Sequence, residues 1–374
     1  MKVALVYDRV NKFGGAERVL LALHEIWPSA PLFTSVYHPK TAGWAKDFRV
    51  IPSFLNKLPF ARNHHELFPW LMPLAFEGFE FDEFDLVISI TSEFAKGIIT
   101  KPETLHFCYC LTPTRYLWSG CNSYFRSSVF KFFSSPIISY LKKWDQIASQ
   151  RVDEYLAISE TVQTRIKKYY GRDSTVIYPG INIRKFKSLK VQKHKKVQKH
   201  KSNFFLIVSR LVPYKKIDLA VKAFNQLGWP LKIIGTGSEL RKLKKIAESN
   251  IEFLDQLTDK ELIGYYQNCH ALIMPQDEDF GLVCLEAQAV GRPVIAYKGG
   301  GALETVIKDK TGIFFEEQTV DSLIKGLKEF KSLKLKPEDC QQQAKKFNVK
   351  IFKREFKNFI ENQWQKHRKK LKLK

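Results

Sequence analysis

The chain has 374 residues, of which 44% are hydrophobic, and it carries a formal net charge of +23 at pH 7. That apolar fraction excludes a globally disordered protein, and the length suits two domains of ordinary size. The excess of positive charge favours anionic partners such as nucleic acid, anionic lipid headgroups or phosphorylated substrates.

The positive charge is concentrated in two segments. Residues 185–201 contain eight lysines and no acid, with a perfect hexapeptide duplication at 190–201, and residues 366–374 also lack any acid. Low complexity and like charge predict a flexible loop at 185–202 and a basic tail. Solvated segments without a specific function and attachment to an anionic membrane surface both fit this composition.

Cysteine spacing and apolar runs bear on the compartment. None of the six cysteines forms a Cys-x-x-Cys pair, which favours reduced, mostly buried thiols and a cytoplasmic protein. Residues 1–8 form a short strand pattern rather than a signal peptide. No uncharged apolar run reaches the length of a transmembrane helix. The nearest candidate, 129–143, is interrupted by lysine, serines and proline, so it suits packing inside the protein or partial insertion at a bilayer surface.

In the first half of the chain, short apolar runs alternate with intervals long enough for helices. The first interval contains an amphipathic pattern at 16–27. The runs that predict strands are 2–7, 32–37, 86–89, 104–110, 154–158 and 175–178. This alternation predicts a doubly wound α/β domain with a mostly parallel sheet.

A second series of the same kind fills the other half. Strands are predicted at 204–209, 231–234, 251–254, 271–274, 293–296 and 312–315, and helices at 217–227, 237–249, 259–268, 282–290, 302–308 and 320–330. The series predicts a second Rossmann-like domain. Apolar residues then recur every three or four positions over 349–364, which predicts an amphipathic final helix.

The segment 275–287 carries the most informative pattern. Glu278 and Glu286 lie eight positions apart, with an apolar strand before them and a helical pattern after them. One carboxylate is therefore expected at the end of a strand and the other inside a helix, with free backbone N–H groups between them. Phosphate donors flanked by two carboxylates suit a sugar nucleotide.

This pattern resembles the Glu-x7-Glu motif of the GT4 family, the glycosyl transferases group 1, which are retaining enzymes with the GT-B fold. The resemblance implies two Rossmann-like doubly wound domains facing a cleft, with a C-terminal helix that crosses back to the N-terminal domain. It implies an acceptor-binding domain at 1–180, a nucleotide-sugar-binding domain at 181–348, and a crossover helix with a basic tail at 349–374.

Residues 209–216 resemble the Gly/Ser-Arg-Leu-x-x-x-Lys segment of the same family. The resemblance implies that Arg210 and Lys215 are catalytic and bind the donor diphosphate. Two fixed cations would offset the charge that develops on the leaving group. The adjacent Lys216 stays open for this role.

The family match also assigns the residues of the first motif. By resemblance Glu278 contacts hydroxyls of the donor sugar and is catalytic, and Glu286 holds the ribose hydroxyls. Backbone amides of Phe280, Gly281 and Leu282 would meet the sugar and phosphate, and a glycine lets the backbone come close.

Two glycine-rich turns follow predicted strands. Gly14 and Gly15 lie between the first strand and the first helix, where paired glycines let the backbone approach a donor phosphate or an acceptor. They do not complete a dinucleotide-binding fingerprint, so nicotinamide binding is not supported. Gly299–Gly301 resembles the Gly-Gly-x-x-Glu turn of the family, and a simple tight turn also explains it.

Residues 108–118 resemble the His-Thr-Pro-Met-Arg-Tyr segment of bacterial WbaZ-like O-antigen mannosyltransferases. Leu111 stands where those proteins often have histidine, which puts the acceptor and the rate in doubt. Arg115 is a candidate contact to the acceptor or the donor, and a structural salt bridge is the alternative. His64, His65 and His106 are interpreted as structural.

No Asp-x-Asp pair suited to a sugar-diphosphate metal is present, and the acids of Asp277–Asp279 alternate along an extended segment. Because Arg210 and Lys215 already supply cations, we predict a metal-independent enzyme without a cofactor.

The resemblance thus implies a retaining hexosyltransferase, with GDP-mannose as donor and a polyprenyl-diphosphate-linked or glycan acceptor in cell-surface polysaccharide synthesis. It would act at the anionic cytoplasmic face of the membrane, with no nucleic acid as partner. A UDP-sugar donor stays open. A basic nucleic-acid-binding protein is a second alternative, although no RRM, KH or helix-turn-helix signature supports it. An inactive protein that binds a sugar nucleotide is a third, and Leu111 is its support.

Overall fold

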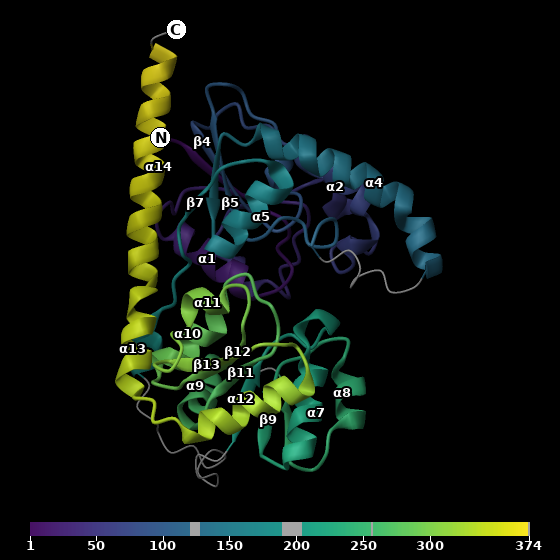
Figure 1. Cartoon of the computed structure of the whole chain (residues 1–374). Coiled ribbons are helices and arrows are strands. Elements are labelled where there is room, and N and C mark those ends of the chain that lie inside the picture. The colour runs from purple at the N-terminus through teal and green to yellow at the C-terminus, as the bar shows by residue number, and fades with distance from the viewer. Residues whose placement is uncertain (120–127, 189–203, 256, 373–374) are drawn as a thin grey trace. The chain divides into compact units, whose positions relative to one another are not determined.

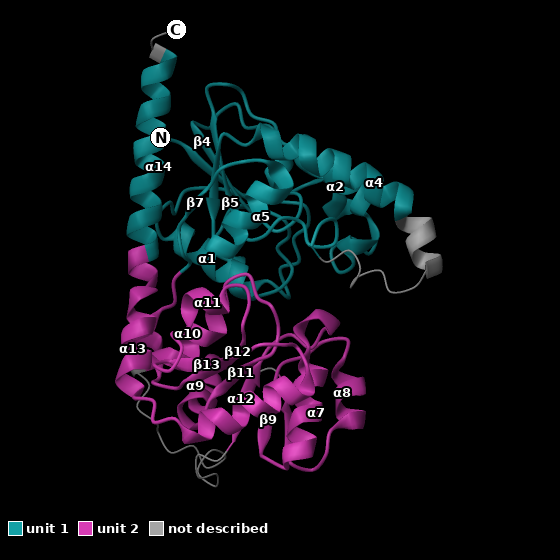
Figure 2. Cartoon of the chain, in the orientation of Figure 1, with its two compact units in different colours: residues 1–179, 352–374 teal, residues 180–351 magenta. Residues whose placement is uncertain are grey.

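The computed structural model describes residues 1–119, 128–188, 204–255 and 257–372 (Figure 1). The chain forms two compact units (Figure 2). Unit 1 comprises residues 1–179 and 352–374, and unit 2 comprises residues 180–351.

Unit 1 is built on a seven-stranded sheet in which every neighbouring pair is parallel, in the order β3-β2-β1-β4-β5-β6-β7. The strands are β1 (Val3–Tyr7), β2 (Leu32–Thr34), β3 (Val50–Pro52), β4 (Leu86–Thr91), β5 (Leu105–Cys110), β6 (Glu154–Ala157) and β7 (Thr175–Val176). Chain order reverses between β1 and β4, which marks the switch point where ligands bind in such sheets. The doubly wound prediction is confirmed for this unit.

The helices of unit 1 are joined by several short 3-10 turns. They are α1 (Gly15–His24), α2 (Met72–Glu77), α4 (Ser128–Arg151), α5 (Glu160–Tyr170) and most of α14 (Val349–Lys372), with turns η1 (Gly43–Ala45), η2 (Phe54–Lys57), η3 (His65–Leu67), η4 (Pro69–Leu71) and η5 (Ala95–Gly97). From residue 135 onward the side chains of α4 are described. Leu141 and Trp144 of α4 pack into a core with Met72 and Phe76 of α2, so this part of the 129–143 run lies partly inside the protein.

Unit 2 is built on a six-stranded parallel sheet in the order β10-β9-β8-β11-β12-β13. The strands are β8 (Phe205–Val208), β9 (Leu231–Ile234), β10 (Ile251–Leu254), β11 (Leu272–Met274), β12 (Val294–Tyr297) and β13 (Gly312–Phe315). Each is almost wholly buried except β10 at the edge, as expected for a parallel sheet covered on both faces. The second Rossmann-like domain is therefore confirmed.

The helices of unit 2 follow its strands. They are α6 (Ile183–Ser188), η6 (Pro213–Lys215), α7 (Ile217–Leu227), α8 (Leu240–Ile246), α9 (Asp259–Asn268), α10 (Leu282–Ala289), α11 (Ala302–Thr305), α12 (Val320–Ser332) and α13 (Pro337–Lys346). The flexible loop predicted at 185–202 begins inside α6, whose Lys185 forms an ion pair with Asp259. The duplicated hexapeptides at 190–201 lie outside the described residues.

Helix α14 begins in unit 2 and continues as part of unit 1, as its two colours in Figure 2 show. Phe352, Phe356 and Ile360 are buried, and the Phe356 ring lies 5.3 Å from that of Tyr109 on β5. These residues belong to the apolar stripe predicted over 349–364. The prediction of a C-terminal helix that returns to the N-terminal domain is confirmed, and the basic tail is helical as far as Lys372.

Among the described helices, none is both long enough and apolar enough to cross a bilayer. Cys108, Cys110, Cys269, Cys284 and Cys340 are free and buried, as the sequence predicts. Cys121 lies outside the described residues.

Stability of unit 1 should fall in acid because of His106 on β5. The imidazole is fully buried, its Nε2 lies 2.8 Å from Ser89 Oγ, and its Nδ1 has no hydrogen-bond partner in the described structure. Burial lowers the pKa of His106 from 6.5 to about 3. Between these two pKa values His106 is protonated in the unfolded chain and neutral in the folded chain. The free energy of unfolding therefore decreases as the pH falls from 6.5 toward about 3.

The slope for this proton is about 1.4 kcal/mol per pH unit. Urea denaturation of the wild type and of His106→Asn checks it. Between about pH 7.5 and about pH 5 the wild type should lose about 2 kcal/mol more than the variant. Equal losses in the two proteins would show that His106 carries a proton in the fold.

Candidate active site

The candidate site in unit 2 lies at the switch point of its sheet. Strands β8 and β11 are neighbours, and Leu206 of β8 is in register with Leu272 of β11. The segment 209–216 leaves the carboxyl end of β8, and the segment 275–281 leaves that of β11 before α10 begins. Because the carboxyl ends of parallel strands share one edge, both predicted motifs meet there.

Lys215 and Glu278 form the centre of this site. Lys215 Nζ makes an ion pair with Glu278 Oε2, although the two residues are far apart in sequence. Gln276 Nε2 donates to the same carboxylate oxygen over 2.9 Å. Lys215 is 8% exposed and Gln276 is 3% exposed, so the carboxylate is held by two nearly buried donors at a poorly solvated position, where charge interactions are stronger.

Arg210 is joined to Lys215 through an aromatic residue that the sequence prediction did not name. The Arg210 guanidinium donates to Tyr214 Oη over 2.5 Å and lies 5.9 Å from the centre of its ring. Lys215 Nζ lies 5.2 Å from the same ring. Arg210 itself is exposed, so an anion could reach it.

Glu286 is placed inside α10, as predicted. It is 1% exposed, and Tyr266 of α9 donates its hydroxyl to Glu286 Oε2 over 2.7 Å. A charge at such depth requires hydrogen-bond partners. Tyr266 therefore orients the carboxylate, and neither spacing nor periodicity in the sequence pointed to it.

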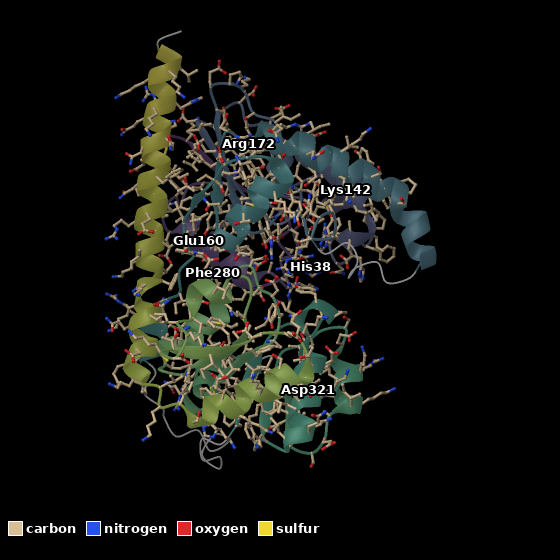
Figure 3. The ribbon with its side chains drawn as sticks, in the orientation of Figure 1. His38, Lys142, Glu160, Arg172, Phe280 and Asp321 are labelled. Atoms are coloured by element: carbon tan, nitrogen blue, oxygen red, sulfur yellow. The ribbon has the colours of Figure 1, made fainter. Side chains whose placement is uncertain are left out.

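Gly281 and Phe280 separate the two glutamates. Gly281 is the N-cap residue just before α10 and lies in the left-handed region at φ 85°, which favours glycine. The Phe280 side chain, labelled in Figure 3, is buried and its ring lies 5.6 Å from that of Phe347. Leu282 follows as the first residue of α10. The predicted contacts of the Phe280, Gly281 and Leu282 amides with a sugar or phosphate stay predictions.

The glycine turn at 299–301 lies directly against this loop. A Cβ on Gly300 would come 2.2 Å from Asp277 Oδ1, and one on Gly301 would come 2.3 Å from Phe280 Cα. The Gly301 amide donates to the Glu278 carbonyl over 2.8 Å. The glycines are therefore needed for close packing behind Glu278, which is more than a tight turn requires.

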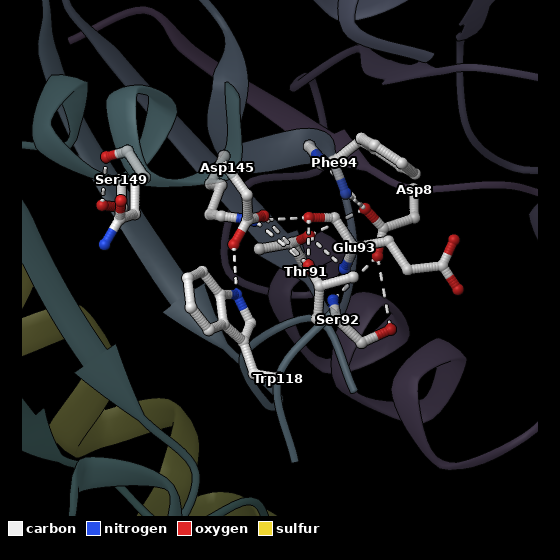
Figure 4. Close-up of polar contacts among 12 residues, drawn as sticks. Asp8, Thr91, Ser92, Glu93, Phe94, Trp118, Asp145 and Ser149 are labelled. Atoms are coloured by element: carbon white, nitrogen blue, oxygen red, sulfur yellow. Dashed lines mark hydrogen bonds and ion pairs between the residues drawn. The ribbon is translucent and has the colours of Figure 1, made fainter. Parts of the chain in front are cut away.

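The predicted residues Gly14, Gly15 and Arg115 belong to unit 1. Gly14 precedes α1 with extended backbone, and Gly15 is the first residue of that helix. Arg115 lies on the segment after β5, which Thr114 and Trp118 attach to Asp145 through hydrogen bonds of 3.0 and 2.7 Å (Figure 4). Their roles toward a donor or an acceptor stay predictions.

A second polar cluster of unit 1 lies at the switch point between β1 and β4. The Asp8 carboxylate accepts from the Thr91 hydroxyl and from the amides of Ser92, Phe94 and Ala95 over 2.7–2.9 Å (Figure 4). It fixes the loop after β4 to the end of β1. No sequence pattern pointed to this function of Asp8.

The neighbouring Arg9 forms an ion pair with Glu93 over 2.6 Å. Burial alone would raise the pKa of Glu93, yet Arg9 holds it below its usual value. Burial, followed by Arg9, lowers the pKa of His65 to about 4. The histidine is therefore neutral near pH 7, in keeping with a structural role.

The sequence model of the family described as glycosyl transferases group 1 matches residues 190–347. This match lies entirely within unit 2. The candidate site of unit 2 falls inside it. The match supports the glycosyltransferase class that the sequence motifs predict.

Similar proteins from other organisms are described as mannosyltransferases. The alpha-1,3/1,6-mannosyltransferase ALG2 of Mus musculus is 25% identical over 363 residues, which cover 82% of each chain. A GDP-mannose-dependent monoacylated alpha-(1-6)-phosphatidylinositol monomannoside mannosyltransferase of Corynebacterium glutamicum is 32% identical over 46% of this chain and 51% of its own. With several of the curated relatives, the match spans about half of the relative's length.

Solved structures match over nearly the whole chain. Sucrose-phosphate synthase from Thermosynechococcus elongatus has a TM-score of 0.76 at 16% identity and covers 98% of this chain and all of its own. HepE from Anabaena in complex with UDP has a TM-score of 0.69 at 18% identity, with 97% and 100% covered. At these identities the likeness shows the fold, which is GT-B.

A metal-independent mechanism and the absence of a cofactor were predicted from the sequence. Among the described residues, no three His, Cys, Asp or Glu side chains converge as metal ligands would. The metal-independent mechanism and the absence of a cofactor nevertheless stay predictions.

Proposed function

We propose that this chain is a retaining GT4-type hexosyltransferase that uses Arg210, Lys215, Glu278 and Glu286 to bind and activate a nucleotide-sugar donor. The observation that carries the proposal is the convergence of Lys215, Gln276 and Glu278 at the switch point of unit 2. A cation and a carboxylate at one poorly solvated position suit a donor that has a diphosphate beside sugar hydroxyls.

The donor reacts through the bond between its sugar C1 and the diphosphate oxygen. As this bond breaks, its electron pair goes to the diphosphate, and Arg210 and Lys215 stabilise the charge that develops there. The acceptor hydroxyl attacks C1 from the same face and passes its proton to the departing phosphate. Glu278 holds the sugar hydroxyls, Glu286 holds the ribose, and no protein nucleophile is required.

GDP-mannose is the proposed donor. The support is that relatives from Mycobacterium tuberculosis and Corynebacterium glutamicum are described as GDP-mannose-dependent, together with the WbaZ-like segment at 108–118. A UDP-sugar is the second candidate, favoured by the likeness to HepE, whose structure holds UDP. The names of the Mycobacterium tuberculosis and Corynebacterium glutamicum relatives include a phosphatidylinositol-based acceptor. This supports a lipid-linked acceptor, and we propose a polyprenyl-diphosphate-linked or glycan acceptor at the cytoplasmic membrane face.

Nucleotide binding tests this proposal directly. In a thermal-shift panel of GDP, UDP, ADP and their sugars, one nucleotide should raise the melting temperature of the wild type, and Glu286→Gln should abolish that rise. Tyr266→Phe removes the hydrogen bond that orients Glu286, so it should weaken binding about 5- to 10-fold, which corresponds to about 1 kcal/mol.

Glu248→Gln is the matched control, because Glu248 is an exposed carboxylate of the same unit away from the switch point. It should bind the nucleotide as the wild type does. The proposal would be refuted by a wild type that no nucleotide stabilises, or by an equal response in the wild type and Glu286→Gln.

A further inference from the structure

The segment that follows β3 in unit 1 exposes an unusual set of large apolar side chains. They are Phe54 (45% exposed), Phe60 (76%), Leu67 (57%), Trp70 (45%) and Leu74 (54%). We call these five residues the 54–74 surface. Single exposed apolar residues are common on soluble proteins, whereas a contiguous apolar patch marks a site of interaction. These five residues lie within one short stretch of chain.

The backbone beneath this surface is tied to unit 1. Leu55, Ala61 and Met72 lie between the exposed residues and are buried in the core of the unit. Asn11 donates to the Arg62 carbonyl over 3.2 Å, and Arg62 Nε donates to the Asn56 carbonyl over 3.0 Å. The chain thus has an inner apolar set that packs and an outer apolar set that an ordered backbone presents to solvent.

Phe60 shows this most clearly. It has the left-handed conformation at φ 62°, where bulky side chains are rare and strained. The Asn63 and His64 amides both donate to its carbonyl, which holds the strained turn in place. The strained backbone of Phe60 costs stability, and its exposed ring gains little by burial. Strained residues of this kind cluster at functional sites, which suggests a functional role for the Phe60 side chain.

The charges around this surface select the partner. Lys57 and Arg62 are exposed within the segment 53–76, and Glu66, its one acid, lies 3.2 Å from His65 Nδ1. The acids begin afterwards: residues 77–85 contain five carboxylates and no lysine or arginine, and they lead into the amino end of β4. Lys2 and Lys101 pair with two of them.

Because β3 and β4 belong to one parallel sheet, the end of β3 and the start of β4 lie at opposite edges. The apolar surface therefore begins, with Lys57 and Arg62, after the carboxyl end of β3, and the acidic stretch leads into the opposite edge of the sheet. Aromatic rings flanked by Lys and Arg on one side suit the interface of an anionic bilayer, which would repel the opposite edge.

We propose that the 54–74 surface docks unit 1 onto an anionic lipid bilayer, with Phe60 and Trp70 entering the headgroup region and Lys57 and Arg62 contacting anionic headgroups. The inference deepens the proposed function, since it rests on a lipid-linked acceptor and names the surface that would bring the enzyme to it.

Co-sedimentation of the full chain with vesicles tests this docking. Vesicles of phosphatidylglycerol and phosphatidylcholine should bind the wild type, and vesicles of phosphatidylcholine alone should bind it weakly. Phe60→Gly with Trp70→Ser should lower the vesicle partition coefficient about tenfold or more, because two apolar side chains are lost. Lys57→Gln with Arg62→Gln should remove most of the dependence on anionic lipid and on salt.

Phe60→Gly separates docking from folding. Glycine adopts φ 62° without strain, so this variant should melt no lower than the wild type while its vesicle binding falls. Ile307→Ser removes an exposed apolar side chain from unit 2 and should bind vesicles as the wild type does. Removal of residues 366–374 gives the contribution of the basic tail.

Unchanged vesicle binding in the Phe60 and Trp70 variant would overturn the proposal, as would a loss caused wholly by removing the tail. Self-association in the absence of lipid is a further contradicting outcome. If the wild type sediments as a dimer without lipid and Phe60→Gly sediments as a monomer, a second copy of the chain occupies this surface, and the docking proposal is overturned. If nucleotide binding persists in a chain that binds no vesicle, only the docking surface fails. If vesicles bind but no nucleotide does, only the transferase proposal fails.

Discussion

Replacing Lys215 by methionine should lower the transfer rate by about 10²–10³-fold while leaving the protein folded. Methionine keeps the length and the apolar stem of the side chain but removes the charge that makes the ion pair with Glu278. In the proposed reaction that charge acts mainly on the diphosphate as it leaves, so its loss should cost about 3–4 kcal/mol of transition-state stabilisation. Steady-state kinetics should show kcat falling far more than KM rises.

Lys216→Met is the matched control. Lys216 is adjacent and of the same type, but it is exposed, and with φ 53° it caps the start of α7. Methionine and lysine are both unbranched at Cβ, so the strain at this position should not change. A large loss of kcat in Lys216→Met together with a small one in Lys215→Met would reverse the assignment of the diphosphate contact.

The fold could be predicted from the sequence where strands are continuous apolar runs. Strands β9, β10 and β13 have the predicted bounds, because buried parallel strands need apolar residues on both faces. The prediction missed β3, a three-residue strand that ends in proline and is only partly buried. Its position at the sheet edge permits both features.

Element ends were predicted less well where local geometry decides them. The strand expected over 32–37 stops at Thr34, and the helix expected over 237–249 is limited to Leu240–Ile246. Before α8, Gly235 and Gly237 approach the backbone of Ser209 and Leu211 too closely for any Cβ. Such contacts between distant segments leave no periodic signal in the sequence.

The helix expected over 302–308 ends at Thr305, and the one expected over 16–27 spans Gly15–His24. Helix α4 was predicted only as an apolar run over 129–143, in part because Pro136 lies inside it. Proline usually ends a helix, which is why the pattern did not indicate one of 24 residues.

The candidate site divides in the same way. The sequence indicated Lys215 and Glu278, because each follows a strand and resembles a family motif. It could not indicate Gln276, Tyr214 or Tyr266, whose relevance depends on which side chain each one contacts. A glutamine or tyrosine near a motif is common, and only the hydrogen bonds to Glu278, Arg210 and Glu286 distinguish these three.

The largest loss of stability should come from Asp145→Asn. Asp145 and Lys96 form an ion pair, and both are almost fully buried. Burial alone would lower the pKa of Lys96, and Asp145 holds it above its usual value. Asparagine keeps the shape of the side chain but leaves a buried ammonium without its counter-charge, which should cost about 3–5 kcal/mol of the free energy of unfolding.

Lys96→Met in the Asp145→Asn background should recover part of this loss, because the uncompensated charge is then gone. Asp173→Asn, which breaks the exposed pair with Lys167, should leave the unfolding midpoint unchanged. Urea denaturation followed by Trp fluorescence is measured for the wild type, Asp145→Asn, Lys96→Met, the double variant and Asp173→Asn. Single variants whose losses simply add in the double variant would show that the two charges do not depend on each other.

The Asp145 carboxylate also accepts hydrogen bonds from Thr114 and from Trp118, which lie on either side of Arg115 in the sequence. Asp145 and Trp118 are labelled in Figure 4. Asp145→Asn should therefore also loosen the segment that presents Arg115, and hydrogen exchange of the amides at 111–118 should become faster than in Asp173→Asn. If Arg115 contacts a substrate, this loosening should raise KM at temperatures where the variant is still folded. A variant with faster exchange but unchanged KM would assign Arg115 a structural role only.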